Sequence, residues 1–122
     1  MTARDPEKLT IYEKPTCTTC RKTVALLNER GIDFEDVNYY VHPLSAAKIA
    51  ELLDKAGISP RELRRTREQA YKDLGLANSD HSEVELIELM AENPDLIQRP
   101  IAERGAKAVL CRPVERILEI LD

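Results

Sequence analysis

The chain has 122 residues, a length that suits one domain with a hydrophobic core of its own. Its formal net charge of -4 argues against a general nucleic-acid binder, and no apolar run approaches the length that a membrane span needs. The first residues, Met1 to Pro6, carry no apolar signal region, so we expect a cytoplasmic protein with reduced thiols.

The first third of the chain predicts a β-α-β unit. Residues 9–13 form a short apolar run and predict a strand, and residues 18–30 show the spacing of a helix that ends at Gly31. The apolar side of this helix is expected to comprise Val24, Ala25 and Leu27. Residues 32–39 predict a second strand, and the short connections imply a right-handed parallel crossover.

Two cysteines lie where the first strand gives way to the helix. Cys17 should sit at the helix start, where unpaired backbone N–H groups and the positive end of the helix dipole favour a thiolate. Cys20 follows three residues later, within reach of a disulfide. In a chain without secretory features, this CxxC spacing favours redox chemistry.

Two other interpretations of the CxxC pair stay open. The pair is also half of a zinc site, but only Cys111, His42 and His81 could add ligands, and none of them pairs with another at the usual spacing. We therefore expect no bound metal. In the second interpretation, Cys20 is a small buried residue and only Cys17 reacts.

Residues 45–93 predict a block of helices. Capping boxes begin at Ser59 and Ser82, each followed by a glutamate three residues later. The helix that starts at Ser82 is expected to turn Val84, Ile87 and Met90 inward.

The last third predicts a hairpin and a final helix. Residues 100–103 and 107–111 are two short runs around a glycine turn, and Pro113 is expected to begin the helix. The complete order is β-α-β, helices, β-hairpin and helix. It predicts an α/β, thioredoxin-like fold with a mixed four-stranded sheet, formed by one domain over residues 1–122 with a helical insertion at about 45–93.

Several separate segments, specific in combination and order, resemble those of the glutaredoxin-type arsenate reductases. They are Pro15–Lys22, Gly57–Ser59 with Leu63–Arg65, Tyr71–Leu76, Arg99–Ile101 and Cys111–Pro113. The resemblance implies reduction of arsenate or a similar oxyanion to arsenite through a covalent adduct at Cys17. It also implies electrons from glutathione with glutaredoxin, or from thioredoxin, and no bound cofactor; we expect a monomer.

The resemblance also assigns an anion site. It implies that Arg65, Arg99 and Arg112 bind the oxyanion, and guanidinium groups do form bidentate, charge-assisted hydrogen bonds with such oxygens. We expect the backbone N–H groups of Thr18 and Thr19 to complete the site. In thioredoxin-like folds a cis-proline faces the reactive cysteine, which predicts a cis bond before Pro100.

The chain departs from this family at two positions. Glu13 stands where many of these reductases have histidine, and an acid there is expected to raise the pKa of Cys17. Cys20 stands where serine is common: either it resolves the adduct as a Cys17–Cys20 disulfide, which we favour, or it is buried and glutathione performs the reduction. The related Spx regulators share this second cysteine, sense oxidants and bind RNA polymerase, and they provide the alternative function.

Overall fold

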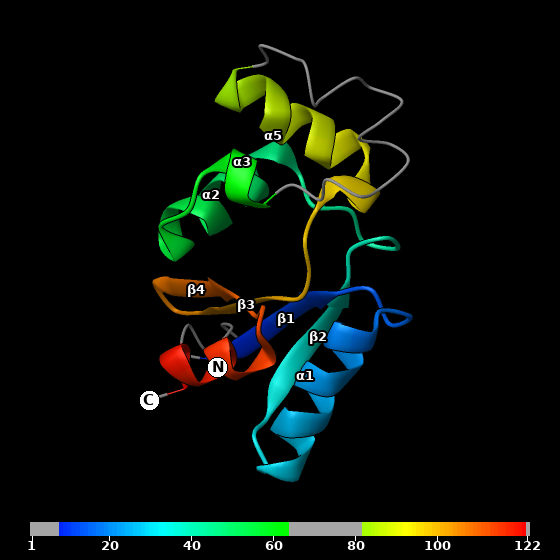
Figure 1. Ribbon diagram of the computed structural model, residues 1–122, viewed down its shortest axis with the longest axis vertical. Helices are drawn as coiled ribbons and strands as arrows, with labels where there is room; N and C mark the ends of the chain where they lie inside the picture. Colours follow the sequence, from blue (N-terminus) through cyan, green and yellow to red (C-terminus); the bar gives the residue numbers. More distant parts are fainter. Residues whose placement is uncertain (1–7, 64–81, 122) are drawn as a thin grey trace, which may run out of the picture. The chain divides into compact units, whose positions relative to one another are not determined.

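The computed structural model describes residues 8–63 and 82–121, which divide into two compact units (Figure 1). One unit consists of residues 1–42 and 99–122, and the other of residues 43–98. The expected anion ligand Arg65 lies outside the described residues, as does His81. That all 122 residues form one domain stays a prediction.

The first unit is built on a mixed four-stranded sheet. Its strands are β1 (Leu9–Glu13), β2 (Phe34–Asn38), β3 (Ile101–Arg104) and β4 (Lys107–Leu110), in the order β2-β1-β3-β4. β1 pairs with β2 in parallel and with β3 antiparallel, and β3 and β4 form an antiparallel hairpin. Helix α1 (Thr18–Glu29) connects the two parallel strands. The predicted sheet and its hairpin are therefore confirmed.

One hydrophobic core joins this sheet to α1 and to the C-terminal 3₁₀ helix η3 (Val114–Ile120), which lie on the same side of the sheet (Figure 1). Its buried members are Leu9, Ile11, Leu27, Ala102, Val109, Cys111, Ile117 and Ile120. Side chains alternate between the two faces of a strand. Leu9 and Ile11 therefore place Glu13, at the end of β1, on the α1 side as well.

Three details of this unit differ from the expectation. Strand β2 begins at Phe34, two residues after the predicted start, and ends at Asn38, one residue before the predicted end; Tyr39 is buried in the turn that follows. In α1 the buried residues are Cys20, Thr23 and Leu27. Ala25 is exposed, because the helical period of 3.6 residues turns it away from that face. The final segment forms a 3₁₀ helix after Pro113, which precedes its first residue.

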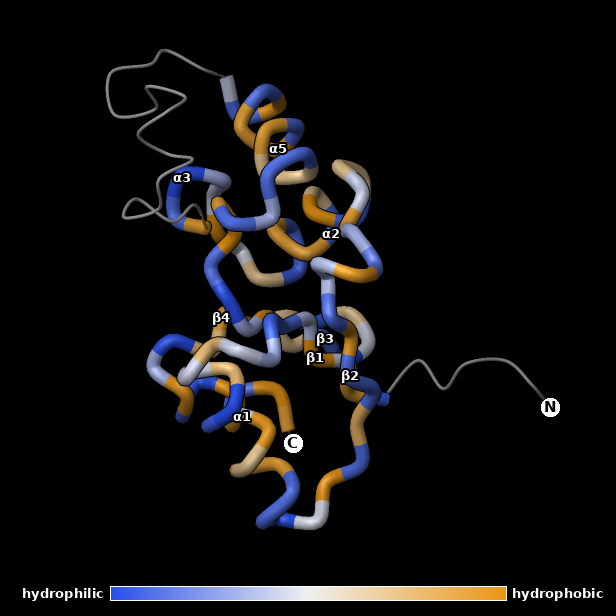
Figure 2. The backbone as a smooth tube through the Cα atoms, turned by 90° about the vertical axis from the view of Figure 1, so that its right-hand side faces the viewer, coloured by the Kyte–Doolittle hydropathy of each residue, from blue (hydrophilic) through white to orange (hydrophobic). Residues whose placement is uncertain are grey.

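The second unit contains the predicted helices. They are α2 (Ala46–Ala56), α3 (Pro60–Leu63), α5 (Glu83–Glu92) and the 3₁₀ helix η2 (Pro94–Leu96). Hydrophobic stretches occur along both α2 and α5 (Figure 2), and these two helices contact each other. Among the described residues, no helix has the length and hydrophobicity that crossing a bilayer demands.

Helix α5 confirms its predicted start and corrects its predicted inner face. The Ser82 hydroxyl accepts a hydrogen bond from the Glu85 N–H at 3.2 Å, and the Glu85 carboxylate accepts one from the Ser82 N–H at 2.9 Å. However, Val84 is 66% exposed, whereas Leu86 and Met90 are buried. Leu86 and Met90 are spaced i, i+4, so they share one face of α5, and Val84 lies on roughly the opposite side of the helix.

Candidate active site

Cys17 caps the N-terminus of α1. Its backbone N–H closes a turn onto the Lys14 carbonyl at 2.9 Å, and its Sγ accepts a hydrogen bond from the Cys20 N–H at 3.4 Å. The sulfur thus occupies the position where a helix start stabilises negative charge. This confirms the expectation that Cys17 lies at the junction of the first strand and the helix.

The two cysteines of the CxxC pair have opposite acidities. Burial opposes ionisation of Cys17, but hydrogen bonds from the backbone and thiol of Cys20 and the contact with Arg99 outweigh it and lower its pKa. Cys20 is fully buried, and burial together with the neighbouring Cys17 raises its pKa to about 12. The structure therefore pairs a cysteine of lowered pKa with a buried, neutral thiol that hydrogen-bonds to it.

Arg99 contacts Cys17, although the two residues are 82 positions apart in the sequence. Arg99 is 6% exposed, and its guanidinium hydrogen-bonds to the Cys17 sulfur and donates from Nη1 to the Tyr40 hydroxyl at 3.3 Å. Its Nε is the one buried side-chain nitrogen or oxygen within residues 8–63 and 82–121 that lacks a hydrogen-bond partner. The bond between Arg99 and Pro100 is cis, as expected from the sequence. A buried cationic group, with one N–H donor that has no partner among the described residues, thus lies beside the Cys17 sulfur.

Arg112 lies next to Arg99. Its Nη1 donates to the Arg99 carbonyl at 3.0 Å, while the rest of the side chain is exposed. The Arg112–Pro113 bond is also cis, which the sequence analysis did not anticipate. Of the three expected anion-binding arginines, the structure therefore brings Arg99 and Arg112 together.

Two tyrosines support this arrangement, and sequence reasoning gave them no role. The rings of Tyr39 and Tyr40 lie 5.1 Å apart, and Tyr40 lies between two cations, with Lys14 Nζ 4.7 Å and Arg99 Cζ 6.0 Å from its ring centre. Burial would lower the pKa of Arg99, but Tyr39, Tyr40 and Cys17 raise it and keep the guanidinium charged. Their position directly after β2, whose end lies beside the end of β1, was the available clue.

Glu13 is 3% exposed and lies close to both cysteines. Burial, a hydrogen bond to Asp36 and the charges of Asp36 and Cys17 raise its pKa from 4.5 to about 8. The carboxyl is thus mostly neutral at pH 7, and the pKa of Cys17 is lowered, whereas the sequence led us to expect that an acid here would raise it. His42, by contrast, is exposed and lies in a turn.

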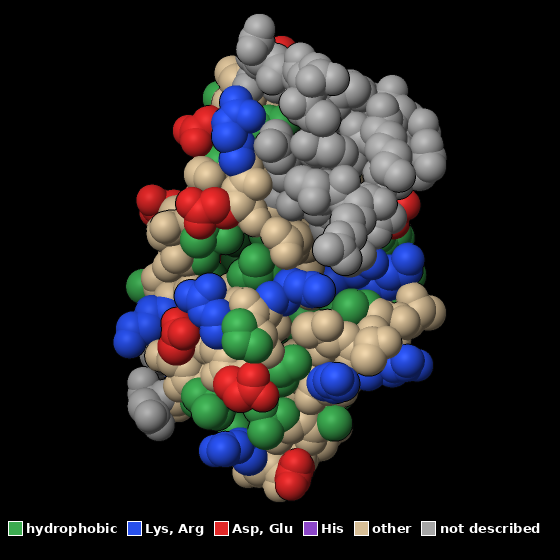
Figure 3. Space-filling view, viewed as in Figure 1, with side chains coloured by type: hydrophobic (Ala, Val, Ile, Leu, Met, Phe, Trp, Pro, Cys, Tyr) green, Lys and Arg blue, Asp and Glu red, His purple; other side chains and the backbone are tan. Residues whose placement is uncertain are grey.

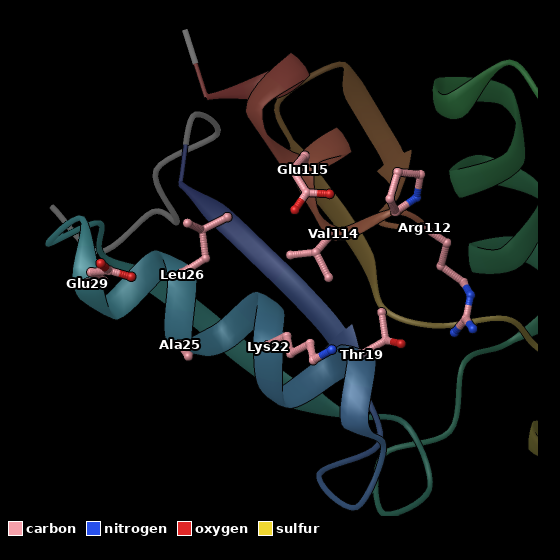
Figure 4. Close-up of a pocket in the computed structure, with 9 residues that line it drawn as sticks. Thr19, Lys22, Ala25, Leu26, Glu29, Arg112, Val114 and Glu115 are labelled. Carbon is pink, nitrogen blue, oxygen red and sulfur yellow. The ribbon is translucent and has the colours of Figure 1, made fainter.

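An open groove of about 560 Å³ runs along α1 from Thr19 to Glu29 (Figure 4). Thr19 and Lys22 line the end next to Arg112, and Glu29 lines the other end. Pro113, Val114 and Glu115 form the wall opposite α1. The groove is therefore basic at the end lined by Lys22 and Arg112 and acidic at the end lined by Glu29.

Comparison with known proteins places this site in a family. The model of the ArsC family matches residues 12–120. The chain belongs to the ArsC family. It is 43% identical to the uncharacterized protein YfgD of Escherichia coli strain K12, over 94% of this chain and 98% of that protein. It is 36% identical to an arsenate reductase of Rhizobium meliloti, over 93% of this chain and 81% of the relative.

Solved structures agree with this assignment. An arsenate reductase from Vibrio cholerae superposes with a TM-score of 0.89 at 36% identity, covering 94% of this chain and 98% of that chain. The fold of this ArsC family member is therefore thioredoxin-like, with the sheet order described above.

On the face that Figure 3 shows, the described lysine and arginine side chains lie in small groups between acidic and uncharged ones. Within the described part of this ArsC chain, no three His, Cys, Asp or Glu side chains come together as a metal site would require. The cation that contacts Cys17 is the Arg99 guanidinium, and the Arg112 guanidinium donates to the backbone carbonyl of Arg99.

Proposed function

We propose that this ArsC family chain is a thiol-dependent arsenate reductase with Cys17 as its nucleophile. The observation that carries the proposal is the contact between Cys17 and Arg99: a cysteine of lowered pKa lies beside a buried guanidinium whose Nε has no partner among the described residues. An oxyanion bound there would satisfy that donor and meet the nucleophile. The arsenate reductases among the relatives support the same substrate.

In the first step the Cys17 thiolate attacks arsenic. A bond forms between Cys17 Sγ and As(V), one As–O bond breaks, and the departing oxygen takes protons and leaves as water. Arg99 and Arg112 neutralise the charge on the remaining oxygens. The N–H groups of Thr18 and Thr19 at the start of α1 are proposed to bind the same oxygens. Arg65 joins them in the proposal on the strength of the family resemblance.

In the second step a thiolate attacks Cys17 Sγ. The S–As bond breaks, its electron pair stays on arsenic, and As(V) becomes As(III) while two thiols become one disulfide. We propose that Cys20 supplies this thiol, because it already hydrogen-bonds to the Cys17 sulfur. Thioredoxin would then reduce the Cys17–Cys20 disulfide; glutathione with glutaredoxin is the other donor system.

The decisive experiment is arsenite production by the purified chain, supplied separately with each donor system. Cys17→Ser is expected to abolish turnover with both. Cys111→Ala is the matched control, because Cys111 is a buried core cysteine and should leave the rate intact. A wild-type protein that is inactive with every donor would contradict the proposal and favour the Spx-like regulator. Binding to RNA polymerase would then be measured.

The anion site has its own test. Arg99→Lys and Arg112→Lys keep a positive charge but lose the bidentate fork, so each is expected to reduce kcat/KM for arsenate by about tenfold or more. Arg116→Lys is the control, because Arg116 pairs with Glu119 at the surface, 3.2 Å away. An unchanged kcat/KM in Arg99→Lys would show that Arg99 does not take part in binding arsenate.

We propose that the groove along α1 is the binding site of a small thiol donor such as glutathione. Its basic end, with Lys22 and Arg112, is suited to a carboxylate of the donor. Lys22→Glu is expected to raise KM for glutathione and to leave KM for arsenate unchanged. Lys48→Glu, on α2, serves as the control. An equal KM for glutathione in Lys22→Glu and wild type would contradict this placement.

A further inference from the structure

Glu13 and Asp36 form a hydrogen-bonded pair of carboxyl groups, with Glu13 buried near the cysteines and Asp36 at the surface. Glu13 is 3% exposed, whereas Asp36 is exposed to solvent. Phe34 packs against the core beneath α1, and side chains two residues apart share a face of a strand, so Asp36 also faces the α1 side. The parallel register pairs Ile11 with Asp36 and thus brings Asp36 beside Glu13, to which it is hydrogen-bonded.

Glu13, the buried member of the pair, lies close to the CxxC segment. The Cys20 thiol contacts the backbone of Lys14, the residue that follows Glu13. The charge of Glu13 acts on Cys20, and the charge of Cys17 acts on Glu13. The titratable groups that face Glu13 are therefore Asp36 from β2 and Cys17 and Cys20 from the start of α1.

This placement addresses a difficulty in the second step of the proposed reaction. Cys20 must become a thiolate before it can attack Cys17, but it is fully buried and its thiol has a pKa of about 12. At pH 7 a thiol of that acidity is ionised to only about one part in 10⁵. A group beside Cys20 must therefore take its proton as the S–S bond forms.

We propose that Glu13 is the proton acceptor for Cys20 and that Asp36 passes the proton between Glu13 and solvent. The proposal rests on the resolving role of Cys20 in the function proposed above. In the step, the S–H proton of Cys20 moves to a carboxylate oxygen of Glu13. The resulting thiolate attacks Cys17 Sγ, and the group bonded to that sulfur departs with the electron pair. The new carboxyl proton then leaves through Asp36.

Covalent bonding of the Cys17 sulfur changes how readily Glu13 ionises. While Cys17 is a thiolate, its charge helps to hold a proton on Glu13. Once the sulfur is covalently bonded, that charge is gone, and Glu13 ionises more readily. Burial and Asp36 still raise the pKa of Glu13, so covalent bonding of Cys17 increases the ionised share of Glu13 without making it complete.

The test needs no arsenate. Reduced protein is mixed with an aromatic disulfide that releases a coloured thiolate on exchange. The first release reports attack by Cys17, and the second reports attack by Cys20 on the mixed disulfide. Cys20→Ser identifies the second phase by removing it. Both rates are measured from pH 5 to pH 10 in wild type, Glu13→Gln and Asp36→Asn.

Glu13→Gln is expected to slow the second phase about 100-fold at pH 7.5, the usual size of general-base assistance, and to leave it dependent only on ionisation of the thiol itself. Asp36→Asn should shift the pH midpoint of that phase. Asp33→Asn is the matched control, because its side chain is 92% exposed beside β2, and both phases should keep the wild-type rate.

Two outcomes overturn the inference. A second phase in Glu13→Gln with the wild-type rate and pH profile would remove Glu13 as the base. A single release in wild type would show that Cys20 does not attack Cys17 at all. Either result leaves arsenate reduction by Cys17 with external glutathione intact. Conversely, a wild-type protein that is inactive toward arsenate but shows both phases would refute the function and leave the proton acceptor standing.

Discussion

Replacing Glu13 with glutamine should change how the stability of the protein depends on pH. The folded state holds a proton on Glu13 up to a pKa of about 8, whereas the carboxyl of an unfolded chain releases it near 4.5. Between these values the free energy of unfolding falls as pH rises, by about 1.4 kcal/mol per pH unit. From pH 5 to pH 8 the loss is about 4 kcal/mol, a large part of the ~5–15 kcal/mol of a typical domain.

The assay is urea unfolding of wild type and Glu13→Gln at pH 5, 6.5 and 8. The glutamine amide can still donate to Asp36, so the two proteins should have similar stability at pH 5, and the variant should be more stable at pH 8 by up to about 4 kcal/mol. The lowered pKa of Cys17 acts with the opposite sign, but it is present in both proteins. Asp33→Asn is the control and should follow wild type. Equal pH dependence in wild type and Glu13→Gln would refute the reasoning.

Three further sets of substitutions test the packing by urea unfolding. Leu27→Ala removes a fully buried side chain from the core beneath α1 and should cost about 2–5 kcal/mol, with a smaller loss for the partly buried Leu26→Ala. Ser82→Ala removes the cap of α5 and should cost about 1 kcal/mol; no change would show that the capping box is not needed. Val84→Thr should lie within about 0.5 kcal/mol of wild type, whereas Leu86→Ala should cost about 2–5 kcal/mol, and the reverse order would contradict the observed face of α5.

Local features were predictable because they depend on residues that are close in the sequence. The capping box at Ser82 needs only a glutamate three residues later, and Cys17 caps α1 through the Cys20 N–H. The burial of Val84 was predicted wrongly for an equally local reason. Apolar residues at 84, 86, 87, 89 and 90 surround most of α5, so periodicity alone does not define which side faces the core.

The assembled site depended on contacts between distant residues. Arg99 and Cys17 are 82 positions apart, and only the resemblance to a known family named Arg99 as a partner of Cys17. Tyr40 received no role, because nothing in its own segment shows that it lies between Lys14 and Arg99. These contacts arise from the pairing of β1 with both β2 and β3, which composition and periodicity do not determine.

The state of Glu13 shows how burial reverses a conclusion drawn from sequence. An ionised carboxylate near Cys17 would oppose its thiolate, and that expectation holds for an exposed acid. Here β1 places Glu13 on the α1 side of the sheet, where burial makes ionisation costly and raises the pKa of the carboxyl to about 8. The same burial keeps Cys20 neutral. Burial thus raises the pKa of both Glu13 and Cys20, whereas hydrogen bonds from Cys20 and Arg99 lower the pKa of Cys17, so these contacts favour the negative charge on the Cys17 sulfur.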